Sequence, residues 1–111
     1  MRPIVFGYLS VPPRTSPREL ERWRRAIEEF AERENFDLNG VFTDPRGRAE
    51  GGFYALVEAL RRDHAVAVVV PTVEHLGYVS ATFGADRRTI TRFLRVRILT
   101  LPDVTPPGVS A

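Results

Sequence analysis

The sequence predicts a three-layer α/β domain built on a mostly parallel sheet of four or five strands. Two apolar runs carry this prediction: residues 4–11 end at two prolines, and residues 65–70 form an unbroken apolar stretch that ends at Pro71. A strand without alternation of polar and apolar residues is typical of a parallel sheet that is covered on both faces. Segments with helical spacing separate the strands, so we expect right-handed crossover connections.

The first strand and the first helix have the clearest signals. The strand, residues 3–11, is rich in β-branched and aromatic residues and stops where two prolines remove two backbone donors. The helix is expected over residues 17–34, because Ser16 is a capping residue and Pro17 stands at the first helical position.

The remaining elements are predicted from shorter patterns. Residues 37–43 form a second strand, and a second helix has apolar residues at helical spacing between residues 53 and 60. The third strand, residues 65–70, is expected at the centre of the sheet. A further helix is expected around residues 90–94 and a fourth strand over residues 96–101. Ligands of such a sheet bind outside the carboxyl ends of its strands, so chemistry is expected in the loops that follow the strands.

Length and composition indicate the class of protein. The 111 residues suit one domain, expected over residues 1–101, followed by a flexible proline-rich tail at residues 102–111. The chain has no cysteine, which excludes disulfides, thiolate zinc sites and cysteine nucleophiles, and its two histidines are too few to predict a metal cluster. No segment has the length of a membrane span or the pattern of a secretory signal. We therefore expect a cytoplasmic protein with no cofactor and no membrane partner.

The basic residues are unusual in type and in one local cluster. All 16 are arginine, a bias typical of a GC-rich genome, and the net charge of +2 is too small to predict nucleic-acid binding by itself. One strongly basic stretch near the carboxyl terminus holds Arg87, Arg88, Arg92, Arg95 and Arg97. A solvated helix face explains such a run, and a contact with phosphates or an acidic partner is the functional alternative. We expect any nucleic-acid binding to be weak and non-specific and to depend on Arg87, Arg88, Arg92 and Arg95.

Four segments, in sequence order, resemble the catalytic domain of the serine recombinases, the resolvases and invertases. They are Gly7–Val11, Val41–Asp44, Phe53–Arg62 and Val68–Gly77, and the likeness extends from about residue 4 to residue 101. The resemblance implies a resolvase-like, flavodoxin-like fold. Together with the arginine bias it suggests a degenerate recombinase-like group that is common in actinomycetes. In the family, a serine attacks a DNA phosphate, and arginines bind that phosphate and stabilise its transition state.

The chemical positions of that family are changed in this sequence. The resemblance places Ser10 at the position of a phosphate-binding arginine and Pro12 at the position of the nucleophilic serine. Further motif positions also differ and hold Glu50, Glu74, His75 and Tyr78. Proline has no oxygen with which to attack, and the family's cations are lost. We therefore expect a catalytically inactive domain that acts as an interaction or regulatory module, with a protein partner or a second copy of itself.

In two alternative hypotheses the chain is an active enzyme. Ser10 is a candidate for a displaced nucleophile, because strand alternation puts it on the same face as Pro12. Ser16 is a second candidate if the segment Arg14–Ser16 carries the family's motif after a short insertion, although Ser16 is also the expected helix cap. Either serine would make the chain a divergent DNA recombinase or nuclease.

A third hypothesis is a small-ligand binder that uses the crevice at the strand ends. His75, beside Glu74, is the best candidate for a titrating or ligand-binding group there, and Asp44 lies at the same predicted edge. The simpler interpretation of His75 is a half-exposed loop residue that replaces a lost catalytic arginine.

Overall fold

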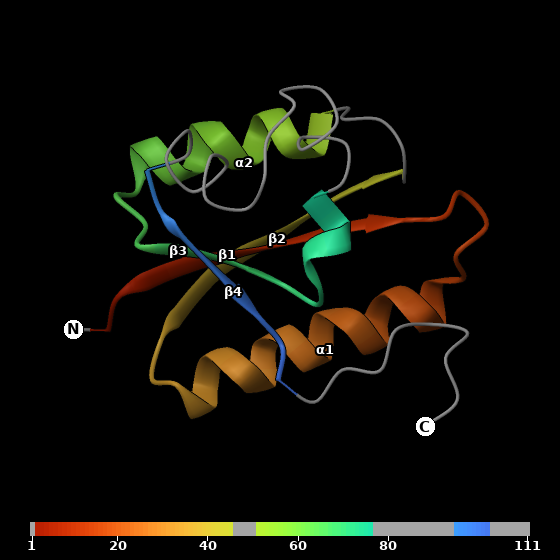
Figure 1. Ribbon diagram of the computed structural model, residues 1–111, viewed down its shortest axis with the longest axis horizontal. Helices are drawn as coiled ribbons and strands as arrows, with labels where there is room; N and C mark the ends of the chain where they lie inside the picture. The colour runs from red at the N-terminus through yellow and green to blue at the C-terminus, as the bar shows by residue number, and fades with distance from the viewer. Residues whose placement is uncertain (1, 46–50, 77–94, 103–111) are drawn as a thin grey trace.

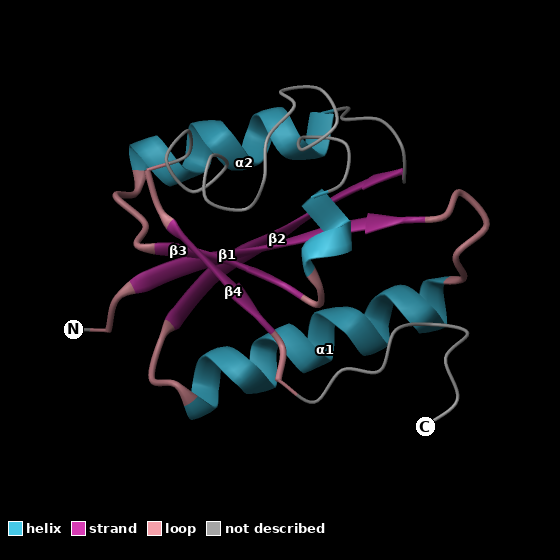
Figure 2. Cartoon of the chain, viewed as in Figure 1, coloured by secondary structure: helices cyan, strands magenta, loops and turns pink. Residues whose placement is uncertain are grey.

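The computed structural model describes residues 2–45, 51–76 and 95–102. Strands and helices alternate along the chain as β1 (Ile4–Val11), α1 (Pro17–Arg33), β2 (Asp37–Pro45), α2 (Gly51–Arg62), β3 (Ala67–Val70), the short 3₁₀ helix η1 (Val73–Leu76) and β4 (Arg97–Thr100). The described strands form one parallel sheet in the order β2-β1-β3-β4. Figures 1 and 2 show α1 on one face of the sheet and α2 on the other. The predicted three-layer α/β class is confirmed.

The predicted first helix is confirmed, and the predicted third strand is too long. The Ser16 Oγ accepts a hydrogen bond from the Glu19 N–H at 3.2 Å, as expected of a cap. The third strand begins at Ala67 because His64, with φ of 54°, turns the chain after α2 and Val66 is left 44% exposed. The inner strands are β1 and β3, so β3 shares the predicted central position. The helix expected around residues 90–94 lies outside the described residues, as do residues 103–111 of the expected tail.

Strand β1 supplies both halves of the core by alternation. Val5 and Leu9 pack in the layer under α1, whereas Phe6 and Tyr8 pack in the layer under α2. Gly7 lies on the α1 side, where an added Cβ would come within 3.1 Å of the Ile27 Cγ2. The absence of a side chain at this position therefore lets α1 approach the sheet closely. None of the described helices is long and apolar enough to span a membrane.

The order of the strands creates a switch point between β1 and β3. Strand β2 lies on one side of β1, and β3 and β4 lie on the other side. Open α/β sheets hold their sites at the point where the strand order reverses in this way. The ladder between β1 and β3 covers only Val5–Gly7 against Ala67–Val69. The last residues of β1 therefore extend beyond β3, next to η1, as Figure 1 shows.

Candidate functional site at the carboxyl edge

Asp44, near the end of β2, is a buried carboxylate that is fully engaged by the fold. It is 2% exposed and accepts hydrogen bonds from the Tyr8 hydroxyl at 2.8 Å, the Gly52 N–H at 2.8 Å and the Phe53 N–H at 2.6 Å. The two backbone donors belong to the first turn of α2, where N–H groups have no partner within the helix and the helix dipole favours a negative charge. Asp44 is thus a long-range cap of α2, and we call Asp44, Tyr8, Gly52 and Phe53 the Asp44 clasp.

Tyr8 provides the only side-chain donor of the Asp44 clasp. Burial raises the pKa of its phenol, and the hydrogen bond to Asp44 and the negative charge of Asp44 raise it further. The neutral phenol is therefore strongly favoured at physiological pH. A group that holds its proton this firmly is a structural donor and a poor general acid.

The raised pKa of Tyr8 predicts a loss of stability at high pH. The folded protein holds the phenolic proton more tightly than the unfolded chain, in which the pKa is near 10.0. The stabilisation is therefore present below about pH 10 and is lost as the pH rises further. We expect the free energy of unfolding, measured by urea denaturation, to fall more steeply above about pH 10 in the wild type than in Tyr8→Phe. Tyr54→Phe, at a side chain that is 65% exposed, is the control and should follow the wild type. Equal alkaline slopes in Tyr8→Phe and the wild type would contradict the assignment.

His75, in η1, completes the hydrogen bonding of β1. Its Nδ1 accepts a hydrogen bond from the Ser10 N–H at 3.0 Å. On the β3 side of β1, the Ile4 carbonyl accepts a hydrogen bond from the Val66 N–H at 2.9 Å. The backbone groups of every second residue in a strand point to the same side, so the Ser10 N–H also points to the β3 side. Strand β3 has ended at Val70, and the imidazole takes the place of the strand residue that would have accepted this bond. The expectation of a half-exposed loop histidine is wrong: His75 is 5% exposed, because it satisfies a buried backbone donor.

The contacts of His75 also fix its chemistry. A nitrogen that accepts a hydrogen bond carries no proton, so a neutral ring has its proton on Nε2. A doubly protonated ring would place an N–H against the N–H of Ser10. The indole of Trp23 in α1 packs against the ring edge to face, with centroids 5.9 Å apart. The Nδ1 atom is therefore occupied by the backbone and is not available to a ligand.

The candidate nucleophiles are held in structural positions. Ser10 is 5% exposed within β1, and its N–H is the group bonded to His75. Pro12 is exposed, and its carbonyl accepts hydrogen bonds from the Thr15 N–H at 3.0 Å and the Thr15 hydroxyl at 2.7 Å. This turn leads to Ser16, whose hydroxyl oxygen accepts the capping bond of α1.

The structure thus brings together three of the residues singled out in the sequence. Ser10, Asp44 and His75 lie at the carboxyl edge of the sheet and are the buried polar residues of the described chain. Arg95 is exposed and lies at the other edge, just before β4. The positions outside the described residues are Glu50, the Glu74 side chain, Tyr78, Arg87, Arg88 and Arg92. Within the described ranges, no three His, Cys, Asp or Glu side chains are placed to hold a metal ion.

The Asp44 clasp was not predicted. Its donors come from β1 and from the start of α2, and residues 45–50 separate Asp44 from the helix that it caps. A sequence signal for a cap requires the capping residue next to the helix, which is absent here. The pair Gly51 and Gly52 was the one available hint, because glycine allows close approach of a backbone.

Two solved structures of recombinases superpose on this chain. The C-terminal catalytic domain of ISC1926 TnpA, an IS607-like serine recombinase, superposes with a TM-score of 0.66 and 17% identity, over 92% of this chain and 72% of that one. A resolvase family site-specific recombinase from Streptococcus pneumoniae superposes with a TM-score of 0.65 and 16% identity, over 98% of this chain and 78% of that one. No protein-family model matches the sequence, and no curated protein matches it significantly. The chain therefore has the fold of the recombinase catalytic domain.

Proposed function

We propose that this chain is a recombinase-fold domain without strand-transfer chemistry, which acts as an interaction or regulatory module. The observation that carries the proposal is that the polar groups described at the carboxyl edge of the sheet stabilise the fold. The polar groups described there cap helices or complete the backbone hydrogen bonding of β1. An enzyme that breaks phosphodiester bonds needs an exposed nucleophile and cations aimed at the phosphate.

Three positions support this proposal when the structure is combined with the sequence resemblance. Pro12, at the position of the family's nucleophile, is exposed but has no attacking atom. Ser10, at the position of a phosphate-binding arginine, is buried and uncharged. His75, at the position of another arginine, is turned inward and occupied by the Ser10 N–H. Loss of one oxyanion-stabilising donor alone costs on the order of 100-fold in rate.

We expect no covalent attachment of the protein to DNA. The full chain is incubated with supercoiled plasmid and then analysed on a denaturing gel without proteolysis, next to an active serine recombinase on its own site. The expected result is neither nicked plasmid nor a protein–DNA adduct, because Ser10 is buried and the Ser16 hydroxyl caps α1. Pro12→Ser is expected to give none either, since it restores a hydroxyl and leaves Ser10 and His75 in place.

The divergent-enzyme hypothesis makes the opposite prediction. An adduct with the wild-type chain that disappears in Ser10→Ala or Ser16→Ala would overturn the proposal and identify the nucleophile. Ser16→Ala also removes a helix cap, which costs about 1 kcal/mol, so circular dichroism must show that this variant is folded. Ser110→Ala keeps both candidate serines and serves as the matched control.

The partner of the module is proposed to be another protein or a second copy of this chain. Size-exclusion chromatography with light scattering, over a range of concentrations, separates these two cases. A molar mass that rises with concentration identifies self-association, and a constant monomer mass excludes it over the tested range and leaves a separate protein as the proposed partner. Nucleic-acid binding through the arginines of residues 87–95 is proposed to be weak and salt-dependent.

A further inference from the structure

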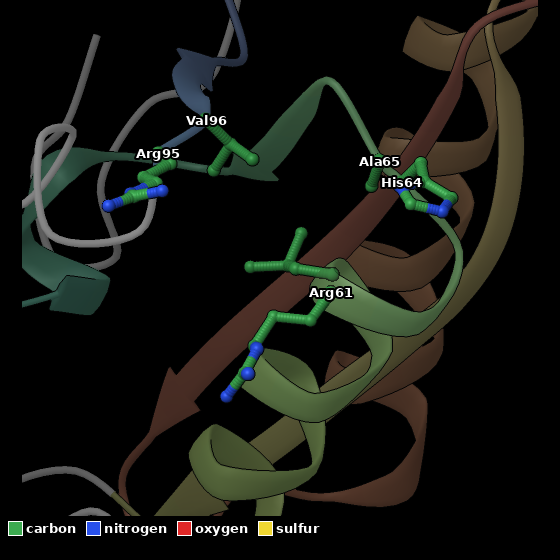
Figure 3. Close-up of a pocket in the computed structure, with 6 residues that line it drawn as sticks. Arg61, His64, Ala65, Arg95 and Val96 are labelled. Carbon is green, nitrogen blue, oxygen red and sulfur yellow. The ribbon is translucent and has the colours of Figure 1, made fainter.

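A recess with basic walls lies at the amino-terminal edge of the sheet, away from the Asp44 clasp. It has a volume of about 690 Å³, within the range of small-molecule pockets. It is formed between the end of α2 and the start of β4. The residues that line it are Leu60, Arg61, His64, Ala65, Arg95 and Val96. Figure 3 shows the side chains of Arg61 and Arg95 extending to the same side of the recess, with His64 at its other end.

The described residues of the lining include three nitrogen-bearing side chains and no carboxylate. Arg61 and Arg95 are exposed, and neither makes an ion pair with any described residue. The neighbouring acid, Asp63, is already engaged, because the Arg62 Nε donates to its Oδ1 at 3.0 Å. The charge of Asp63 is thus compensated by Arg62, and the two lining guanidinium groups are left without a described counter-ion.

Two of the last carbonyls of α2 already have backbone partners. The Ala59 carbonyl accepts a hydrogen bond from the Asp63 N–H at 3.0 Å, and the Leu60 carbonyl accepts one from the Ala65 N–H at 3.2 Å. Basic side chains in the last turn of a helix are often explained as caps of free carbonyls. That explanation does not apply to Arg95, which precedes a strand.

The backbone supports a use for the side chains of the recess. His64 and Arg95 have φ values of 54° and 58°, in the left-handed region that a Cβ atom disfavours and that glycine adopts freely. The other described non-glycine residue with positive φ is Asn35, and asparagine and histidine are both residue types that tolerate this conformation. Arg95 is thus the position in the recess whose backbone conformation is unusual for its residue type, and its side chain donates hydrogen bonds.

We propose that Arg61, His64 and Arg95 form a binding site for phosphate groups at this edge of the sheet. Guanidinium groups bind phosphate oxygens by paired, charge-assisted hydrogen bonds, and an imidazole N–H adds a further donor. Leu60, Ala65 and Val96 provide apolar contact for the body of a phosphate ester. Such a phosphate belongs either to a small ester or to the backbone of a nucleic acid. The site goes beyond the proposed function and does not depend on it.

Pyrophosphate and a labelled DNA duplex test the site with the full chain. Binding of pyrophosphate is measured by isothermal titration calorimetry and binding of the duplex by fluorescence anisotropy. We expect Arg95→Gly and Arg61→Ala each to weaken binding about tenfold or more, as expected for loss of a charged hydrogen-bonding partner. Glycine relieves the strained backbone at residue 95, so Arg95→Gly should keep or raise the melting temperature. A loss of binding in this variant cannot then be attributed to unfolding.

The controls separate the site from general charge effects. Arg33→Ala removes an exposed arginine at the end of α1, and Asn35→Gly relaxes a positive φ outside the recess. Both are expected to bind like the wild type. If the chain binds pyrophosphate but not the duplex, the phosphate group recognised by the site belongs to a small molecule. If it binds the duplex but not pyrophosphate, the phosphate group belongs to the nucleic-acid backbone. Failure of the wild type to bind either probe, or unchanged binding in Arg61→Ala and Arg95→Gly, would overturn the proposal. The DNA-adduct assay is independent of both results.

Discussion

Replacing Asp44 by alanine is expected to lower the free energy of unfolding by about 3 kcal/mol or more, because each buried donor left without a partner costs about 1–3 kcal/mol. Three donors lose their acceptor at once: the Tyr8 hydroxyl and the N–H groups of Gly52 and Phe53. The loss is measured by urea denaturation followed by circular dichroism. An alanine at this position should also reduce helix formation at the start of α2, since the N–H groups there lose the carboxylate that caps them.

A matched control lies in the same strand. Asp37, at the first position of β2, is exposed, and Asp37→Ala is expected to change the stability by no more than about 0.5 kcal/mol. Tyr8→Phe removes one of the three bonds and should cost about 1 kcal/mol. In a double-mutant cycle, Asp44→Ala and Tyr8→Phe together should cost less than the sum of the two, since they break the same bond. Additive costs, or equal effects of Asp44→Ala and Asp37→Ala, would contradict the role assigned to Asp44.

Replacing Gly52 by alanine is expected to destabilise the protein by about 2 kcal/mol or more, within the range seen for overpacked cores. A Cβ at this position would meet the backbone carbonyl of Thr43 and would lie 2.7 Å from the Asp44 Oδ1. Backbone cannot yield as a flexible side chain does, so α2 must move away from β2. That movement lengthens the hydrogen bonds from the Gly52 and Phe53 N–H groups to Asp44.

The adjacent glycine gives the control for this prediction. A Cβ at Gly51 meets no atom within 4 Å, so Gly51→Ala should be neutral or slightly stabilising, because alanine has the higher helix propensity. Thermal unfolding of the two variants, side by side, measures the difference. Equal melting temperatures would show that α2 does not approach β2 as closely as described. The double variant Gly52→Ala and Asp44→Ala should lose less unfolding free energy than the sum of the two single variants. The reason is that Gly52→Ala already weakens the hydrogen bonds that Asp44→Ala removes.

The Asp44 clasp bears on function as well as on stability. In the clasp, the buried Asp44 carboxylate accepts hydrogen bonds from the fold itself, and His75 accepts one from the buried Ser10 N–H. Both groups lie at the edge where α/β sheets commonly hold their ligands. The polar groups described at this edge thus serve folding. This use of the edge is the physical support for the binding role that we propose.

Local sequence signals determined the identity and order of the described strands and α-helices, whereas the short helix η1 was not predicted. The unbroken apolar residues of β3, the prolines after β1 and the cap formed by Ser16 and Pro17 each act over a few residues, and each was sufficient to place its element. The class of the sheet followed from these elements, because alternating strands and helices leave only parallel crossover connections. The resemblance in motif order agreed with the same fold.

Only the tertiary structure decided what the polar residues at the site do. Asp44 caps a helix that begins several residues further along the chain, and His75 accepts from Ser10 because β3 ends before β1. The recess is lined by Arg61, at the end of α2, and by Arg95, just before β4, and the pairing of β4 with β3 sets the position of that edge. Hydrophobic periodicity is a local property that a sequence displays directly. The partners of a buried polar group are set by strand lengths and register, which arise only when the whole chain has packed.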